Sequence, residues 1–283
     1  MSAGATLRAV LAQPSGAISV GLVALHVALA LTAPLFVPHD PTAQSADLIL
    51  QAPSWAHPFG TDRLGRDLLS RAMLGGREAM LIATLSTLMA MVWGTATGLF
   101  VALVGGRTDA YAMRIVDALM SIPWVLTVMI FVAALGVGAM ALIPVLGFSY
   151  GLSVIYIARA AALDFVARDF VQAAQARGQS RGTILWREIL PNVRDTLAVQ
   201  GAMQWSWILL GISSLSFLGL GVAPPAPDWG LMIADGRGVM QTAPWTVLWP
   251  MVLLSSLIVG VNLAADAFAK ALGVDLAPGV AVA

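Results

Sequence analysis

Few side chains in this sequence have the type and spacing that a catalytic or cofactor site requires. Lys270 is the sole lysine and Ala271 follows it, so the chain lacks the G-x-x-x-x-G-K-[ST] loop that binds ATP phosphates. The three histidines, His26, His39 and His57, are not spaced as metal ligands, and no cysteine supplies a thiolate. The sequence contains no H-E-x-x-H motif. We therefore predict no catalytic, cofactor-binding or metal-binding residue. Any energy that the function of this protein requires is expected to come from a partner or from an ion gradient.

Charged side chains instead gather in one interval, residues 168–195, between two strongly apolar stretches. The interval holds five arginines and three acidic residues: Arg168, Arg177, Arg181, Arg187, Arg194, Asp169, Glu188 and Asp195. Helical spacing predicts one shared face for Val166, Phe170, Ala173, Ala174 and Arg177. Gly178 follows where a helix end favours positive φ, and Ser180 can cap a second short helix that runs towards Pro191.

Two short helices around a glycine turn also describe a DNA-binding motif. The flanks of this interval are apolar, the formal net charge of the chain is zero, and no other segment is basic enough to hold DNA. Nucleic acid is therefore not an expected partner. The two small alanines on the first short helix favour close docking of another protein surface.

Composition indicates the environment of the whole chain. Hydrophobic residues make up 59% of the 283 residues, charged residues only 11%, and the mean hydropathy is +0.85. A soluble domain carries about 25% charged residues, so most of this chain must face lipid or other helices. We predict an all-α membrane protein. Because about 20 apolar residues cross a hydrocarbon core, we predict six transmembrane helices, near 18–37, 79–104, 114–136, 146–162, 197–220 and 247–268.

The spans divide the chain into segments. We predict an N-terminal tail at 1–17, the first span at 18–37, an outer loop with an amphipathic segment at 38–78, a five-helix core at 79–270 that contains the polar loop 164–195, and a C-terminal tail at 271–283. In the outer loop, Asp62 is expected to cap a helix that includes Leu64 and Leu68. Residues 136–147 are expected to form a tight outer hairpin, because they carry no charge and contain a proline.

Polar and small residues inside the spans raise separate expectations. Gly94 and Gly98 have the spacing that favours close helix packing, and His26 is expected to hydrogen-bond to a neighbouring helix. The fifth span contains candidate pathway residues, Gln204, Trp207, Ser213 and Ser214. Polar residues in a span usually face protein or water, so these four either line a translocation pathway or join helices.

Two stretches carry a family resemblance. Residues 169–191 contain Gln172-Ala173-Ala174, Gly178 and Ile189-Leu190-Pro191, which resembles the E-A-A-x-x-x-G and L-P pattern in the coupling loop of ABC importer permeases. Residues 57–71, HPFGTDRLGRDLLSR, resemble the signature of the dipeptide, oligopeptide and nickel type of these permeases. The signature residues are Gly60, Thr61, Asp62, Gly65, Arg66 and Asp67.

The resemblance implies a type I ABC importer permease fold with a cytoplasmic coupling loop, in the inner membrane of a bacterium. The implied partners are a second, homologous permease subunit, two ABC ATPases that bind ATP and Mg²⁺, and an extracytoplasmic solute-binding protein. The residues implied to contact the ATPases are Phe170, Gln172, Ala173, Ala174, Arg177, Gly178, Leu190 and Pro191. Substrates of the family include dipeptides, oligopeptides, nickel chelates, glutathione and some sugars, and no residue here decides among them.

Charge distribution predicts the orientation. If the six spans are correct, ten of the fifteen Lys and Arg residues lie on the side of the termini and the polar loop, which places both termini in the cytoplasm. A stand-alone secondary transporter or channel is the alternative function. Such a protein would favour several buried carboxylates, or broken helices in paired repeats, and the sequence shows no internal repeat.

Overall fold

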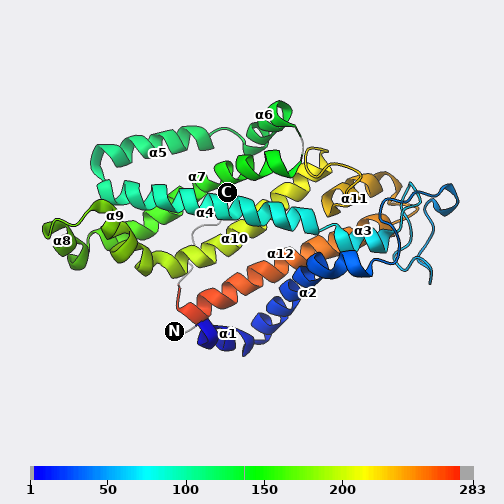
Figure 1. Ribbon diagram of the computed structural model, residues 1–283, viewed down its shortest axis with the longest axis horizontal. Coiled ribbons are helices and arrows are strands. Elements are labelled where there is room, and N and C mark those ends of the chain that lie inside the picture. The colour runs from blue at the N-terminus through cyan, green and yellow to red at the C-terminus, as the bar shows by residue number, and fades with distance from the viewer. Residues whose placement is uncertain (1–2, 137, 275–283) are drawn as a thin grey trace.

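The computed structural model describes residues 3–136 and 138–274, and this part of the chain forms helices and no β-strand, as predicted. The long helices follow the longest axis of the molecule (Figure 1). In chain order the elements are α1 (Ala3–Leu11), α2 (Pro14–Phe36), η1 (Ala46–Leu48), α3 (Leu68–Leu74), α4 (Arg77–Val104), α5 (Gly106–Met120), α6 (Trp124–Leu135), α7 (Ala139–Val166), α8 (Asp169–Ala176), α9 (Arg181–Ile184), η2 (Leu185–Ile189), α10 (Leu190–Phe217), α11 (Trp229–Gly236), η3 (Arg237–Val239) and α12 (Trp245–Leu272).

Several of these helices have the length and composition of a membrane span. Four stretches qualify among the described residues, namely Pro14–Phe36, Leu68–Val104, Ala141–Val166 and Trp245–Leu272, and the bent pair of α5 and α6 makes up to five. Helix α10 is as long as α4 and α7 but is less apolar, because it carries Gln204 and several serines. The count of six spans therefore stays a prediction.

Several element boundaries differ from the predicted ones. The first long helix begins at Pro14 rather than at residue 18. The third predicted span, 114–136, is broken between α5 and α6 by a bend of 77°, because Pro123 lacks an N–H and disfavours a helical residue before it. The hairpin predicted over 136–147 is wrong: α7 already begins at Ala139 and includes Pro144. The C-terminal tail predicted at 271–283 lies outside the described residues from position 275 onwards.

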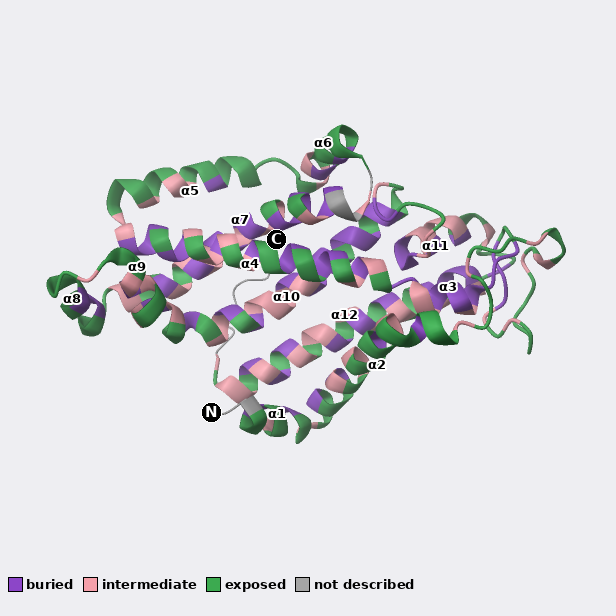
Figure 2. Ribbon diagram, in the orientation of Figure 1, coloured by how far each residue is buried: buried purple, intermediate pink, exposed green. Residues whose placement is uncertain are grey.

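Helices α4 and α7 form the centre of the molecule, and glycines let them approach. A Cβ atom on Gly94 would lie 2.7 Å from the carbonyl oxygen of Gly151, and one on Gly98 would lie 2.6 Å from that of Ile155. Neither site has room for a side chain, which confirms the predicted close packing. Buried residues concentrate along α4, α7 and α10, whereas α2 and α5 are largely exposed (Figure 2).

Two polar contacts fasten α5 and α2 to neighbouring helices. Arg159 on α7 donates two hydrogen bonds to Asp109 on α5, with nitrogen–oxygen distances of 2.5 and 2.6 Å. On α2, one ring nitrogen of His26 lies 2.8 Å from the carbonyl oxygen of Leu22, and the other lies 3.1 Å from that of Leu253 on α12. The prediction that His26 joins neighbouring helices is confirmed.

Candidate functional site

Helix α8 and the turn after it have the predicted local structure. Helix α8 ends at Ala176, and Gly178 follows with a φ of +74°. The N–H of Gly178 donates to the carbonyl oxygen of Gln175 at 2.9 Å, and the N–H of Gln179 donates to that of Ala174 at 3.2 Å. This pair of bonds is the glycine-terminated helix end that satisfies the last helical carbonyls. Gly178 therefore fixes the direction in which the chain leaves α8.

The second helix begins as predicted but does not stop at the proline. The hydroxyl of Ser180 accepts a hydrogen bond from the N–H of Thr183 at 3.2 Å and so caps α9. The π-helical turn η2 then joins α9 to α10, and Leu190 and Pro191 form the first turn of that long helix. Pro191 lacks the N–H that would continue the helical hydrogen bonds, and the wide π-helical turn, in which the N–H of Leu190 donates to the carbonyl oxygen of Leu185, lies directly before it. The predicted coupling loop thus continues without interruption into α10.

The predicted shared face of α8 is wrong in one respect, because its two alanines point in different directions. Val171 and Ala174 are fully buried, whereas Ala173 is exposed. Val171 and Ala174 pack in a core cluster with residues from α4, α7, α9, η2 and α10, among them Leu99, Ala158, Ala162, Ile184, Ile189 and Val193. Ala174 therefore holds α8 against its own chain, and Ala173 remains on the surface.

The outward surface of this segment combines aromatic, polar and charged side chains. Phe170 is 38% exposed, and Gln172, Ala173, Arg177 and Pro191 are also exposed, while Leu190 is partly buried. Trp186 in η2, 69% exposed, belongs to the same segment and was not predicted from the sequence. Its position inside a polar interval, next to Arg187, was the available signal. Large exposed aromatic residues are typical anchors of protein–protein contacts.

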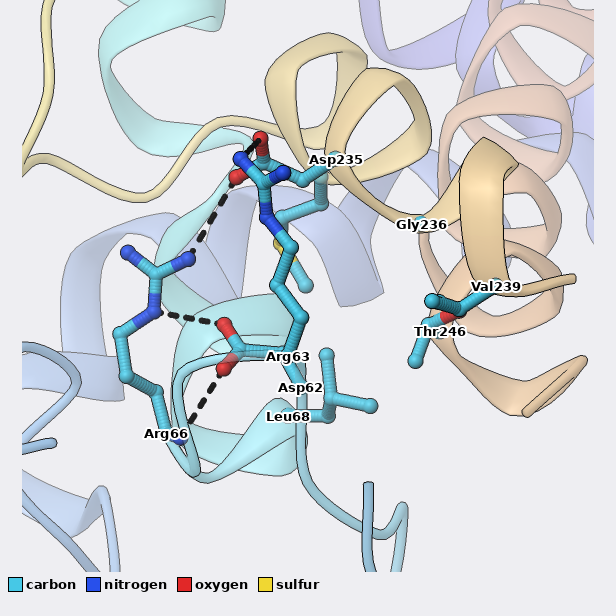
Figure 3. Close-up of a pocket in the computed structure, with 9 residues that line it drawn as sticks. Asp62, Arg63, Arg66, Leu68, Asp235, Gly236, Val239 and Thr246 are labelled. Carbon is cyan, nitrogen blue, oxygen red and sulfur yellow. Dashed lines mark hydrogen bonds and ion pairs between the residues drawn. The ribbon is translucent and has the colours of Figure 1, made fainter. Parts of the chain in front are cut away.

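The signature residues lie at the opposite end of the molecule from α8 and α9 (Figure 1), where the first outer loop meets α11. Figure 3 shows the ionic cluster there. Asp62 accepts hydrogen bonds from the N–H groups of Leu64 and Arg66, at 2.8 and 3.0 Å, and from the guanidinium of Arg66 at 2.6 Å. Arg66 and Arg63 both reach Asp235 on α11, at 3.4 and 2.7 Å.

Asp62 therefore closes a turn, and the prediction that it caps a helix is wrong. The helix starts later, at Leu68, and Asp67 caps it by accepting a hydrogen bond from the N–H of Ser70 at 2.8 Å. The chain before Asp67 is occupied by the tight turn at Gly65, whose φ is +71°. A Cβ atom on Gly65 would overlap the carbonyl oxygen of Ser45, so the turn requires glycine.

The remaining signature residues, Gly60 and Thr61, join the outer loop to the C-terminal half of the chain. Gly60 has a φ of +74°, and a Cβ there would lie 2.8 Å from the indole ring of Trp245. The indole N–H of Trp245 donates to the carbonyl oxygen of Thr61 at 3.3 Å, and the hydroxyl of Thr61 accepts from the N–H of Gln51 at 2.8 Å. The structure thus brings all six signature residues together, and their contacts tie distant outer segments to one another.

Helix α11 begins with a buried carboxylate. Asp228 caps the helix by accepting a hydrogen bond from the N–H of Leu231 at 3.0 Å. Burial raises the pKa of Asp228 to about 6, and the negative charge of Glu78 acts in the same direction, although hydrogen bonds to the carboxylate oppose the rise. Beside it, the indole N–H of Trp229 donates to the carbonyl oxygen of Ala72 on α3 at 2.8 Å.

Two histidines and an acid meet in the first outer loop, which the sequence spacing did not predict. His57 Nδ1 lies 2.9 Å from Asp67 Oδ1, and His39 Nδ1 lies 3.7 Å from Asp67 Oδ2. The two imidazole rings lie 4.7 Å apart, centre to centre. The expectation that the histidines form no metal-ligand group was based on their separation along the chain, and the fold of the loop overrides that separation.

With this geometry established, comparison with known sequences decides the family. The profile of the family described as "Binding-protein-dependent transport system inner membrane component" matches residues 94–276. The chain belongs to this family. The di/tripeptide transport system permease protein DppC of Pseudomonas aeruginosa is 34% identical over 254 residues, which cover 88% of this chain and 84% of that protein.

Other relatives agree with this assignment. The dipeptide transport system permease protein DppC of Haemophilus influenzae is 33% identical over 91% of this chain and 88% of its own length. The probable D,D-dipeptide transport system permease protein DdpC of Escherichia coli is 33% identical over 90% and 85%. The chain is therefore a permease subunit of an ABC importer with the type I fold, and it is a multi-pass membrane protein. Its family is not itself catalytic, and the resemblance seen in the sequence is confirmed.

The four candidate pathway residues of this permease do not share one face of α10. Gln204 and Ser213 are buried within the subunit, and nine residues place them on opposite sides of the helix. Trp207, 54% exposed, and Ser214 lie seven residues apart on one outward face. Gln204 and Ser213 thus pack inside the subunit, and only the face with Trp207 and Ser214 is open to a partner or a pathway.

Proposed function

We propose that this permease forms half of a translocation pathway for dipeptides or similar small peptides. The observation that carries the proposal is its identity of 33–34% with relatives whose names state dipeptide or di/tripeptide transport, over 88–91% of this chain. The outward face of α10 with Trp207 and Ser214 is the surface that we assign to this pathway. A homologous second permease subunit would supply the other half.

We further propose that the segment from α8 to the start of α10 receives the force of ATP hydrolysis from partner ATPases. Support comes from three features: the segment projects at one end of the molecule (Figure 1), it exposes Phe170 and Trp186, and Val171 and Ala174 fix it to the core. A docked ATPase can therefore move α8 and, through the continuous η2 turn, α10. ATP and Mg²⁺ would bind to the ATPases and not to this chain.

The orientation that we propose is an inner-membrane protein with both termini and the coupling segment in the cytoplasm. The outer loop and α11 then face the extracytoplasmic solute-binding protein. Trp55 in that loop is fully exposed, which suits an anchor for such a partner. The absence of cysteine from the sequence allows single-cysteine labelling with an impermeant thiol reagent. Gln44→Cys and Ala226→Cys should be labelled in intact cells, and Gln179→Cys should not; the opposite pattern would reverse the orientation.

Reconstitution tests the function. The purified permease should hydrolyse no ATP by itself, whereas proteoliposomes that contain both permeases and the ATPases should accumulate labelled dipeptide when ATP and loaded binding protein are present. Dipeptide uptake by this chain alone, driven by an ion gradient, would favour the stand-alone transporter. ATP hydrolysis by this chain alone, lost in Lys270→Ala, would contradict the assignment of ATP binding to partners.

A further inference from the structure

We propose that His39, His57 and Asp67 bind a divalent cation of intermediate softness, Zn²⁺ being the best fit, and that the cation clamps the outer loop. Among the described residues, these three side chains form a group whose donor atoms all lie within 4.8 Å of one another. Two imidazoles and one carboxylate are the donor set of many zinc sites. Imidazole disfavours Mg²⁺ and Ca²⁺, which select oxygen ligands.

The distances between the donor atoms are close to those of a tetrahedral site. Metal–ligand bonds of about 2.0–2.2 Å at tetrahedral angles separate neighbouring donors by roughly 3.3–3.6 Å. His57 Nδ1 lies 2.9 Å from Asp67 Oδ1, and His39 Nδ1 lies 3.7 Å from the other carboxylate oxygen, Asp67 Oδ2, so the two separations fall on either side of that range. Shifts of about half an ångström would therefore admit the ion. A water molecule would complete the four ligands, because the His39 side chain is 42% exposed and leaves one side open.

The surrounding contacts already hold the three ligands in place. Asp67 is buried at the N-terminus of α3, and its Oδ2 accepts hydrogen bonds from the N–H and the hydroxyl of Ser70, at 2.8 and 2.7 Å. The same hydroxyl accepts a hydrogen bond from the backbone N–H of His39 at 3.1 Å. Ser70 thus positions both Asp67 and His39. A carboxylate has about four acceptor positions, so capping α3 leaves Asp67 able to bind a cation.

The connectivity indicates what the ion would do. His39 lies three residues after the end of α2, His57 lies in the middle of the outer loop, and Asp67 begins α3. One ion would therefore fasten the end of α2 to the loop and to α3.

Calorimetric titration of Zn²⁺ into the full-length permease, purified with its partner subunits through a tag without histidine, tests the proposal. We expect one Zn²⁺ per chain in this site, a loss of affinity greater than about 100-fold in His39→Ala, and no displacement by excess Mg²⁺. Losing a group that merely orients a ligand already costs about 10- to 100-fold. Asp67→Asn is the second variant: asparagine still caps a helix, so α3 should persist while Zn²⁺ binding is lost.

Asp40→Asn is the matched control, because Asp40 is an exposed carboxylate next to His39 that lies outside the group. It should bind Zn²⁺ as the wild type does. Co²⁺ provides an independent readout, since a tetrahedral site gives intense visible absorption that His39→Ala should abolish. Absence of Zn²⁺ binding at micromolar concentrations, or equal binding by wild type, His39→Ala and Asp67→Asn, would overturn the proposal. Dipeptide uptake by His39→Ala without added metal serves as a check that the variant folds.

Discussion

Enlarging Ala174 should loosen the coupling segment from the inside, whereas enlarging Ala173 should leave the fold intact and block docking. Ala174 is fully buried between α8 and the ends of α4, α7 and α10, and Ala173, one residue earlier, is exposed. The pair thus adds the same volume at positions about 100° apart on one short helix, one towards the core and one towards solvent. Leucine is the suitable replacement, because it keeps helix propensity and adds no charge.

The magnitude follows from the packing at each site. Forcing extra methylene groups into a filled core typically costs about 1–3 kcal/mol. For Ala174→Leu, that cost would raise the population in which α8 detaches from the core by roughly 5- to 150-fold, at 1.4 kcal/mol per factor of ten. For Ala173→Leu, the added side chain meets solvent in the isolated subunit, and substitutions of this kind usually stay within about 0.5 kcal/mol.

Limited trypsin digestion measures the detached population. Arg177 and Arg181 flank the glycine turn and are exposed, and cleavage there tracks local opening when reclosing is fast. Ala174→Leu should be cleaved faster than the wild type even without ATPases. Ala173→Leu should be cleaved at the wild-type rate but should retain less ATPase on co-purification and support less uptake. Faster cleavage of Ala173→Leu with unchanged cleavage of Ala174→Leu would refute the orientation of α8, and full ATPase retention by Ala173→Leu would refute docking at this surface.

Three further substitutions test other parts of the structure. Gly178→Val should reduce uptake severely, because a β-branched residue is strained at a φ of +74°. Gly178→Asn should keep most of the uptake, because asparagine tolerates that conformation. Similar uptake by both variants would show that the turn does not matter. Gly98→Leu should lower the thermal midpoint in detergent because its Cβ has no room against α7, and Gly21→Ala, where a Cβ meets open space, should not; equal midpoints would contradict the close packing. The pKa of Asp228 is about 6 in the folded state against an ordinary 3.8, so between these values the folded state holds a proton that the unfolded state has lost. The stability of the fold should therefore fall as the pH rises from about 4 to 6, by roughly 3 kcal/mol from this group. Asp228→Asn keeps a capping side chain and should flatten that dependence in thermal melts across this range, and an unchanged slope would contradict the assignment to Asp228.

The sequence by itself determined the class of the protein and the local structure of its coupling segment. The scarcity of charged residues predicted membrane helices, because no water-facing surface can be built from so few. The turn at Gly178 and the cap at Ser180 were predictable for a different reason. Both depend on hydrogen bonds that span at most five residues, between Gln179 and Ala174 and between Thr183 and Ser180. The residues that make such contacts lie only a few positions apart, so their spacing can be recognised in the sequence.

The tertiary structure decided the contacts between residues far apart in the chain. Helical spacing placed Ala173 and Ala174 on one broad face, and only the packing of α8 against α7, α9 and η2 separated the buried alanine from the exposed one. The tertiary structure likewise decided the contacts of Asp235 with Arg63 and Arg66, which lie in the other half of the chain.

The outer loop shows the physical reason most directly. Twenty-eight residues separate His39 from Asp67, and no periodic pattern joins them. Their approach depends on the turns at Gly60 and Gly65, on the N-cap of α3, and on the hydroxyl of Ser70, which bonds to both residues. Of these local features, the cap was predicted five residues too early, at Asp62, and the bonds of Ser70 were not predicted. Their combined geometry, accumulated over many backbone angles, is fixed only when the loop packs against α11 and α12.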